Sequence, residues 1–141
     1  MANEYSKENV WKIMEDSKTV NFIRAIGLPD RKNIRIDIET YTAIDGEASQ
    51  ELVDELHILR QDMTRRTAKT LKKLDVTAEE LKCGLSDEKA VKQVSEYLHK
   101  YDGVIVSYGT CAVISDINKI AMEFQIPLVE NNQFDMKKMT K

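Results

Sequence analysis

The sequence has few of the residues that dictate an unusual architecture. Among 141 residues it contains two cysteines, Cys83 and Cys111, and two prolines, Pro29 and Pro127. Two cysteines in unrelated contexts form no disulfide framework, so we expect a cytoplasmic protein. The five glycines fall at the ends of predicted elements, and neither GxGxxG nor GxxxxGK[ST] occurs. The glycine-rich loops that usually hold nucleotide phosphates are therefore excluded.

Long apolar runs and an excess of one charge are also missing. No apolar run approaches the roughly 20 residues that a membrane helix needs, and the N-terminus lacks the apolar stretch of a signal peptide. The net charge is −3, with acids and bases interspersed. A protein built to coat nucleic acid needs a basic face. We therefore expect no membrane association and do not expect nucleic acid as a partner.

What is present is an ordinary globular composition, with 42% hydrophobic and 32% charged residues. This length and composition predict one domain, residues 1–141, with a frayed tail from about residue 131. The predicted fold class is α/β, with α+β as the alternative. It comprises an N-terminal β-hairpin, a long central helix and a C-terminal strand–helix–strand unit, combined in a mixed sheet with helices.

The N-terminal half is predicted to be a helix, a hairpin and a second, longer helix. A helix over 6–18 precedes two β-branched, alternating segments, 20–26 and 33–41, that predict an antiparallel hairpin. Its buried face would hold Ile34, Ile36 and Ile38, and its other face Arg35, Asp37 and Glu39. From Ala48 to Leu74, leucines recur at helical spacing, with acids early and bases late, as the helix dipole favours. A helix of about 27 residues is longer than such a domain, so we expect a homodimer.

The C-terminal half reads as two capped helices followed by a strand–helix–strand unit. Thr77 to Glu80 matches a capping box, and Ser86 can cap the next helix. Residues 104–106 are a β-branched run, residues 113–124 have helical spacing, and residues 126–129 predict a second strand. Parallel strands joined by a helix are expected.

The loop after the first of these strands is the predicted binding site. It opens a helix at the carboxyl end of a buried strand, where backbone N–H groups and the helix dipole favour an anion. A phosphorylated small molecule or a nucleotide would bind there without catalysis, and the simpler alternative is a tight turn with a helix cap. The predicted ligand-binding residues are Ser107, Tyr108, Gly109, Thr110, Cys111, Asn131, Arg65 and Arg66.

Two other functions stay open, and no catalytic residue, metal site or cofactor is assigned. Cys111 in a first helical turn could act as a nucleophile in a small enzyme, although buried cysteines are more often core residues. The long helix could instead make the chain a protein–protein adaptor or inhibitor. We interpret His57 and His99 as solvated surface residues, because neither has a partner at ligand spacing.

One short motif suggests metal-dependent chemistry. Asp37-Ile38-Glu39-Thr40 resembles the first motif of metal-dependent 3′–5′ exonucleases, in which alternate carboxylates on a strand hold two magnesium ions. The resemblance covers only Arg35 to Tyr41, and it implies phosphodiester chemistry with Asp37 and Glu39 as metal ligands. Such folds continue with further strands, whereas a long helix is predicted here. Alternating acids are also ordinary on an exposed strand face, which is the interpretation we prefer.

Overall fold

The computed structural model describes residues 18–28, 31–44, 47–107 and 112–135. Within them, five strands form one mixed sheet in the order β3-β2-β1-β4-β5. In chain order the elements are β1 (Thr19–Leu28), β2 (Arg31–Ile44), β3 (Glu47–Leu59), α2 (Ala68–Leu74), α3 (Ala78–Lys82), α4 (Asp87–Lys100), β4 (Val104–Ser107), α5 (Ala112–Glu123) and β5 (Gln133–Asp135).

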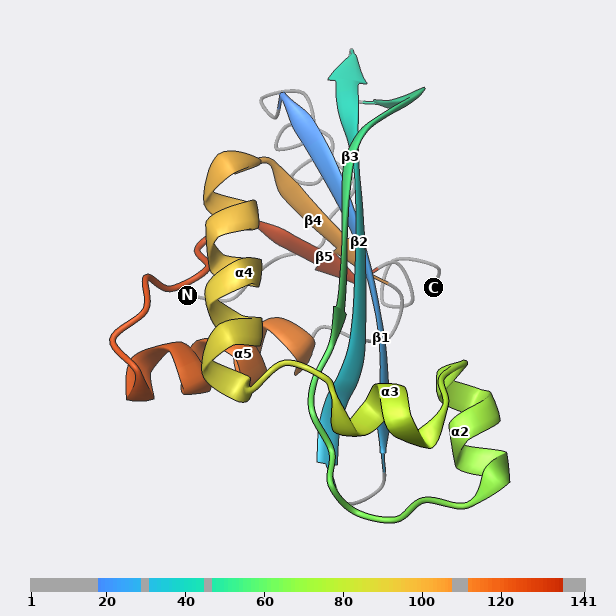
Figure 1. Cartoon of the computed structure of the whole chain (residues 1–141). Helices are drawn as coiled ribbons and strands as arrows, with labels where there is room; N and C mark the ends of the chain where they lie inside the picture. Colours follow the sequence, from blue (N-terminus) through green and yellow to red (C-terminus); the bar gives the residue numbers. More distant parts are fainter. Residues whose placement is uncertain (1–17, 29–30, 45–46, 108–111, 136–141) are drawn as a thin grey trace.

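The sheet combines an antiparallel half with a parallel half (Figure 1). Strand β2 pairs antiparallel with both β1 and β3, while β4 runs parallel to β1 and to β5. The predicted N-terminal hairpin and the C-terminal strand–helix–strand unit are therefore confirmed, as is the α/β class. In the β1–β2 register Asn21 lies opposite Thr40 and Arg24 lies opposite Asp37.

Helices α4 and α5 cover one face of this sheet (Figure 1). Because successive strand residues point to opposite faces, every second residue of β2 contributes to the core below these helices. Ile36 and Ile38 are at most 1% exposed and pack with Val94 of α4 and Ile117 of α5. The predicted buried face of the hairpin is confirmed, and the intervening polar residues of β2 lie on the other face.

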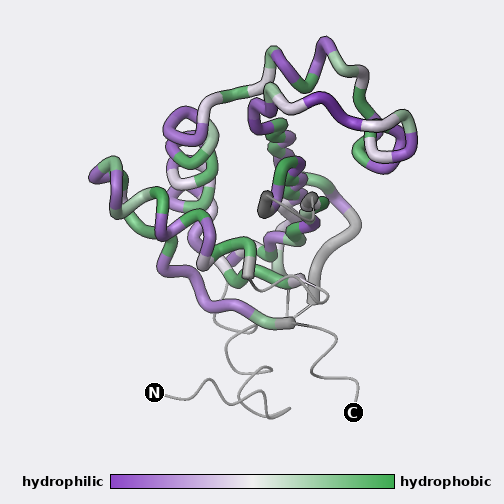
Figure 2. Tube along the Cα trace, turned by 90° about the horizontal axis from the view of Figure 1, so that it is seen from below, coloured by the Kyte–Doolittle hydropathy of each residue, from purple (hydrophilic) through white to green (hydrophobic). Residues whose placement is uncertain are grey.

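Caps read from the sequence define the helices around the sheet. Thr77 and Glu80 form a capping box at the start of α3, and the Ser86 side chain accepts from the Lys89 N–H at the start of α4. Figures 1 and 2 both place α2 and α3 together, apart from α4 and α5. The two short helices close a second small core through Leu74 and Leu81.

The predicted long central helix is wrong. Residues 47–59 form β3, residues 60–67 are a connection, and only Ala68–Leu74 is helical. The paired outer edge of β2 explains the difference, because its backbone groups gain a hydrogen-bonded ladder from β3 between Leu59 and Glu47, with shifts of register between Thr40 and Ala43. That tertiary pairing overrides the helix propensity of a segment rich in Leu and Glu.

The predicted strand at 126–129 is also wrong, because the partner of β4 is β5 at Gln133–Asp135. Pro127 has no N–H to give to a sheet ladder. Val129 instead exchanges two hydrogen bonds with the Asn118 side chain of α5, at 2.9 and 3.0 Å. The chain then needs four more residues to reach β4, so the second parallel strand begins late.

The fold removes the basis of one further prediction, the homodimer. The described residues include no helix long and apolar enough to cross a membrane. The homodimer was inferred from a helix of about 27 residues that does not exist, so that inference loses its basis. The predicted first helix over 6–18 lies outside the described residues except for Lys18, and the cytoplasmic location stays a prediction.

Candidate nucleic-acid interface

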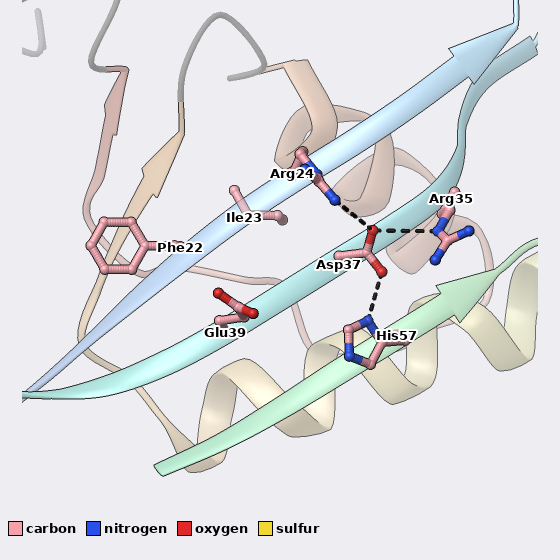
Figure 3. A pocket seen from close by; sticks show the side chains of 7 residues that line it. All are labelled: Phe22, Ile23, Arg24, Arg35, Asp37, Glu39 and His57. Carbon is pink, nitrogen blue, oxygen red and sulfur yellow. Dashed lines mark hydrogen bonds and ion pairs between the residues drawn. The ribbon is translucent and has the colours of Figure 1, made fainter. Parts of the chain in front are cut away.

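The sheet face opposite α4 and α5 gathers polar and aromatic side chains from three strands. β1 contributes Phe22 and Arg24, β2 contributes Arg35, Asp37 and Glu39, and β3 contributes His57. These residues alternate with core isoleucines, which is why they share one face. With Ile23 they line a hollow of about 340 Å³, which Figure 3 shows. This volume lies in the range of small-ligand sites.

Asp37 is the centre of this hollow. The β-sheet register sets Arg24, Asp37 and His57 side by side on β1, β2 and β3. The Asp37 Oδ1 atom lies 2.7 Å from the His57 Nδ1 atom, and Oδ2 lies 3.4 Å from the Arg35 Nε atom and 4.0 Å from the Arg24 Nη2 atom. The carboxylate is 11% exposed. Three nitrogen-bearing groups therefore surround one largely buried carboxylate, as the dashed lines in Figure 3 mark.

The two arginines differ in freedom. Arg24 is 79% exposed, and its only contact drawn to Asp37 is the long one at 4.0 Å. Arg35 is 28% exposed and also donates from Nη1 to the Leu74 carbonyl oxygen at 2.7 Å. Leu74 is the last residue of α2, so the positive charge of Arg35 also lies at the negative, C-terminal end of the helix dipole. Arg35 is thus fixed from two sides, while Arg24 is available to a ligand.

His57 links two carboxylates on the same face. Its Nδ1 atom contacts Asp37, and its Nε2 atom contacts Glu55 of the same strand. These two hydrogen bonds raise the pKa of His57 above its ordinary value of 6.5, against a smaller opposing effect of burial. The side chain is 52% exposed. The prediction of a simply solvated His57 therefore misses its two partners.

An aromatic pair borders the hollow. The rings of Phe22 and Tyr41 meet edge to face, with centroids 5.7 Å apart and an interplanar angle of 75°. Phe22 is 39% exposed, so part of its side chain faces solvent. An exposed ring on a sheet face beside arginines is the arrangement on which nucleobases stack.

The described residues of the predicted binding site do not come together. Ser107 ends β4, is buried, and lies with its Oγ atom 3.4 Å from the Phe134 carbonyl oxygen. Asn131 donates to the carbonyl oxygens of Tyr101 and Gly103, which precede β4. The two residues lie at opposite ends of β4 because Asn131 comes before β5 rather than after a strand. Residues Tyr108, Gly109, Thr110 and Cys111 lie outside the described residues, and their role stays a prediction.

Arg65 and Arg66 lie in the connection between β3 and α2 rather than on a helix. Arg65 is exposed, and Arg66 pairs with the buried Asp62 at 2.7 Å. Burial works to raise the pKa of Asp62, but hydrogen bonds from Arg66 and from the Thr64 backbone lower it overall. The two arginines border a separate hollow of about 400 Å³ that includes neither Ser107 nor Asn131.

Sequence reasoning missed Phe22, Arg24 and His57 as site residues. A usable signal existed at Asp45-Gly46, which is a common two-residue hairpin turn between alternating segments. As a hairpin turn, this dipeptide predicts a strand over residues 47–59. The ladder between β2 and β3 shifts its register twice between Ala43 and Thr40, and only then does His57 come to lie opposite Asp37.

Comparison with known proteins identifies the fold. No protein-family model matches the chain, and no curated protein matches its sequence. Solved structures do match. The first is a structure of a 3′-exonuclease, described as showing 3′-end-specific recognition of histone mRNA stem-loop. Its TM-score is 0.56 at 11% sequence identity, and the match covers 79% of this chain and 42% of the exonuclease chain. A full-length 3′-exonuclease has TM-score 0.55 and 11% identity, over 77% and 53% of the two chains. SSB/Exonuclease I in complex with the inhibitor CFAM has TM-score 0.62 and 8% identity, over 88% and 30%.

The chain thus shares a fold with exonucleases and spans between 30% and 53% of their chains. This finding corrects two predictions. The prediction of a non-enzymatic protein for a nucleotide or phosphorylated small molecule is contradicted, because the structures that share this fold are exonucleases. The exclusion of nucleic acid is contradicted, because a structural neighbour recognises a histone mRNA stem-loop. The adaptor hypothesis also loses the long helix on which it rested.

The described residues do not fit the magnesium site that the exonuclease motif implies. Asp37 faces two guanidinium groups and an imidazole, and Glu39 is its only carboxylate neighbour on β2 within that motif. Within the described ranges no group of three or more His, Cys, Asp and Glu side chains is arranged to hold a metal ion. Divalent magnesium prefers several oxygen ligands, and adjacent arginines oppose a second cation.

Proposed function

We propose that this chain binds single-stranded nucleic acid across the sheet face formed by β1, β2 and β3. Arg24 contacts a backbone phosphate, Arg35 supports the neighbouring one, and Phe22 stacks with a base. The proposal rests mainly on the hollow, where the exposed side chains of Arg24 and Phe22 lie next to the fixed side chain of Arg35. Groups of these two kinds are what sequence-tolerant binding of single strands requires.

The fold supports this ligand class. One neighbour is described as a 3′-exonuclease that recognises the 3′ end of a histone mRNA stem-loop, and another as Exonuclease I. The present chain carries a net charge of −3, so its affinity must come from the local arrangement rather than from a general basic field. We therefore expect modest affinity with a shallow salt dependence.

The magnitude follows from the number of phosphate contacts. For single strands, the slope of log K against log salt is about −0.7 for each phosphate neutralised. Two contacts, from Arg24 and Arg35, predict a slope of about −1.4. Loss of one base stack costs about 1–3 kcal/mol, which corresponds to roughly a 5- to 150-fold loss of affinity.

The test is fluorescence anisotropy with end-labelled single-stranded RNA and DNA of mixed sequence, titrated over a salt series. Arg24→Gln is expected to reduce the salt slope by about 0.7, and Phe22→Leu to lower affinity at least about 5-fold without changing the slope. Arg65→Gln is the matched control, because Arg65 is an exposed arginine of the other hollow. Equal effects of Arg24→Gln and Arg65→Gln, or no binding at low salt, would refute the proposal.

A further inference from the structure

We infer that Asp37 is a positioning residue that holds a phosphate-binding group of arginines together without a divalent cation. The inference rests on the proposed function, but its metal part can be decided on the protein alone. It departs from the chemistry that the motif Asp37–Thr40 implies, in which the same carboxylate would hold magnesium.

The first support is the geometry around the carboxylate. Both carboxylate oxygens of Asp37 face nitrogen atoms. Oδ1 lies 2.7 Å from the His57 Nδ1 atom, and Oδ2 lies 3.4 Å from the Arg35 Nε atom. The side chain is 11% exposed, so little of its surface remains for a further ligand. A metal ion bound there would have to displace these partners and lie beside the guanidinium of Arg35.

The second support is the way in which Arg35 is fixed. Asp37 holds its Nε atom and the Leu74 carbonyl oxygen holds its Nη1 atom at 2.7 Å. A guanidinium held from two sides loses little conformational entropy when it binds an anion. Asp37 thus orients the planar group, and its own charge is offset by the arginines that it holds.

The third support is the contrast with Glu39, the other carboxylate of the hollow. Glu39 is exposed, and its recorded contact is the Tyr41 hydroxyl, which donates at 3.3 Å. Within the described residues, the ion pairs of Arg24 and Arg35 in this hollow are made with Asp37 and not with Glu39. Glu39 therefore serves as the matched control: both residues carry one negative charge in the same hollow, and only Asp37 positions cations.

The two substitutions should act in opposite directions on nucleic-acid binding. Removing a bystander carboxylate strengthens binding of a polyanion, so Glu39→Gln is expected to raise affinity about 2-fold. Asp37→Asn removes the same charge but releases Arg35 and His57, so affinity is expected to fall about 3- to 10-fold. Its salt slope should become shallower by about 0.7, corresponding to one lost phosphate contact. A merely structural role would leave that slope unchanged.

The experiment combines anisotropy in EDTA and in magnesium chloride, at matched ionic strength, with calorimetric titration of manganese chloride into the protein alone. We expect equal affinity in both buffers and no manganese binding at millimolar concentration. Tighter Asp37→Asn binding, dependence of wild-type binding on magnesium, or manganese binding that Asp37→Asn abolishes would overturn the inference.

Two arrangements keep the test decisive. If Asp37→Asn fails to fold, Arg35→Lys retains the charge but lacks the planar fork, and it is expected to weaken binding to a similar extent. Unchanged affinity of Arg35→Lys would then refute the inference. If the wild-type protein binds no nucleic acid, the proposed function fails, while the manganese titration still decides whether Asp37 takes a metal.

Discussion

Replacing Thr40 by valine is expected to destabilise the protein by about 3 kcal/mol, because it breaks a fully buried hydrogen-bond chain. The Thr40 Oγ1 atom donates to the Asn21 Oδ1 atom at 2.6 Å and lies 2.6 Å from the Tyr97 hydroxyl. Thr40 and Asn21 are 0% exposed and Tyr97 is 9% exposed. Valine has the same shape but leaves two polar groups unsatisfied, at about 1–3 kcal/mol each.

This chain of hydrogen bonds also bears on the proposed site. Asn21 and Thr40 face each other in the β1–β2 register, three residue pairs from Arg24 and Asp37. A register slip of one residue would turn Arg24 to the core face. The polar pair therefore helps to specify the alignment on which the hollow depends.

The assay is urea unfolding of Thr40→Val, Tyr97→Phe and the double variant. Tyr97→Phe removes one hydrogen bond and leaves the bond from Thr40 to Asn21, so about 1 kcal/mol is expected. The double variant should cost less than the sum, with a coupling of about 1–2 kcal/mol, because the two hydroxyls act on each other. A cost below about 1 kcal/mol for Thr40→Val, or strict additivity, would refute this reasoning.

Three further predictions concern charge and close packing. Since the pKa of His57 is raised in the folded protein, its contribution to stability is complete below pH 6.5 and is lost as pH rises through the folded-state pKa. The exposure of His57 limits this contribution to less than about 1 kcal/mol. Proton NMR should show a titration midpoint for His57 above 6.5 that falls in Asp37→Asn. An unchanged midpoint would contradict the assignment of the raised pKa to the hydrogen bond with Asp37. Asp116→Ala should lower the free energy of unfolding in urea by about 3 kcal/mol, because Arg60, which is 5% exposed, loses a carboxylate partner at 3.0 Å. A cost below about 1 kcal/mol would show that Asp87 alone neutralises the buried Arg60 charge. Gly103→Ala should cost about 3 kcal/mol or prevent folding, because its Cβ atom would lie 2.0 Å from the Thr19 carbonyl oxygen, and a variant with wild-type melting temperature would disprove this contact.

Local patterns predicted the parts of the fold that local forces determine. The isoleucines of β2 alternate strictly, so its two faces could be assigned from the sequence, and the structure confirms them. The capping box at Thr77 and the cap at Ser86 satisfy backbone donors within a few residues, and both are confirmed. Such interactions need no knowledge of the remaining chain.

The parts that failed depend on partners outside the segment itself. Segment 47–59 has helical spacing of leucines as well as an alternating pattern, and the open edge of β2 decides between them. Residues 126–129 look like a strand, but Asn118 takes the hydrogen bonds of Val129. In both cases the local pattern fits two structures, and a contact outside the segment selects one.

The site could be predicted only in part for the same reason. Alternation along β2 alone predicts that Arg35, Asp37 and Glu39 share one face of the strand. Arg24 and His57 join them through cross-strand register, which no local pattern of β1 or β3 encodes. The prediction that Ser107 and Asn131 lie at the same edge of the sheet depends on a strand at 126–129, whereas the structure has that strand at Gln133–Asp135.

The most direct test of the nucleic-acid interface is amide chemical-shift mapping of the ¹⁵N-labelled protein with a short single-stranded oligonucleotide in EDTA. The largest changes are predicted at residues 22–24 of β1, 35–39 of β2 and 55–57 of β3, the strand segments that carry the 340 Å³ hollow. Changes confined to residues 62–66 and 78–82, or to the end of β4 at Ser107, would contradict the assignment of this face as the binding surface.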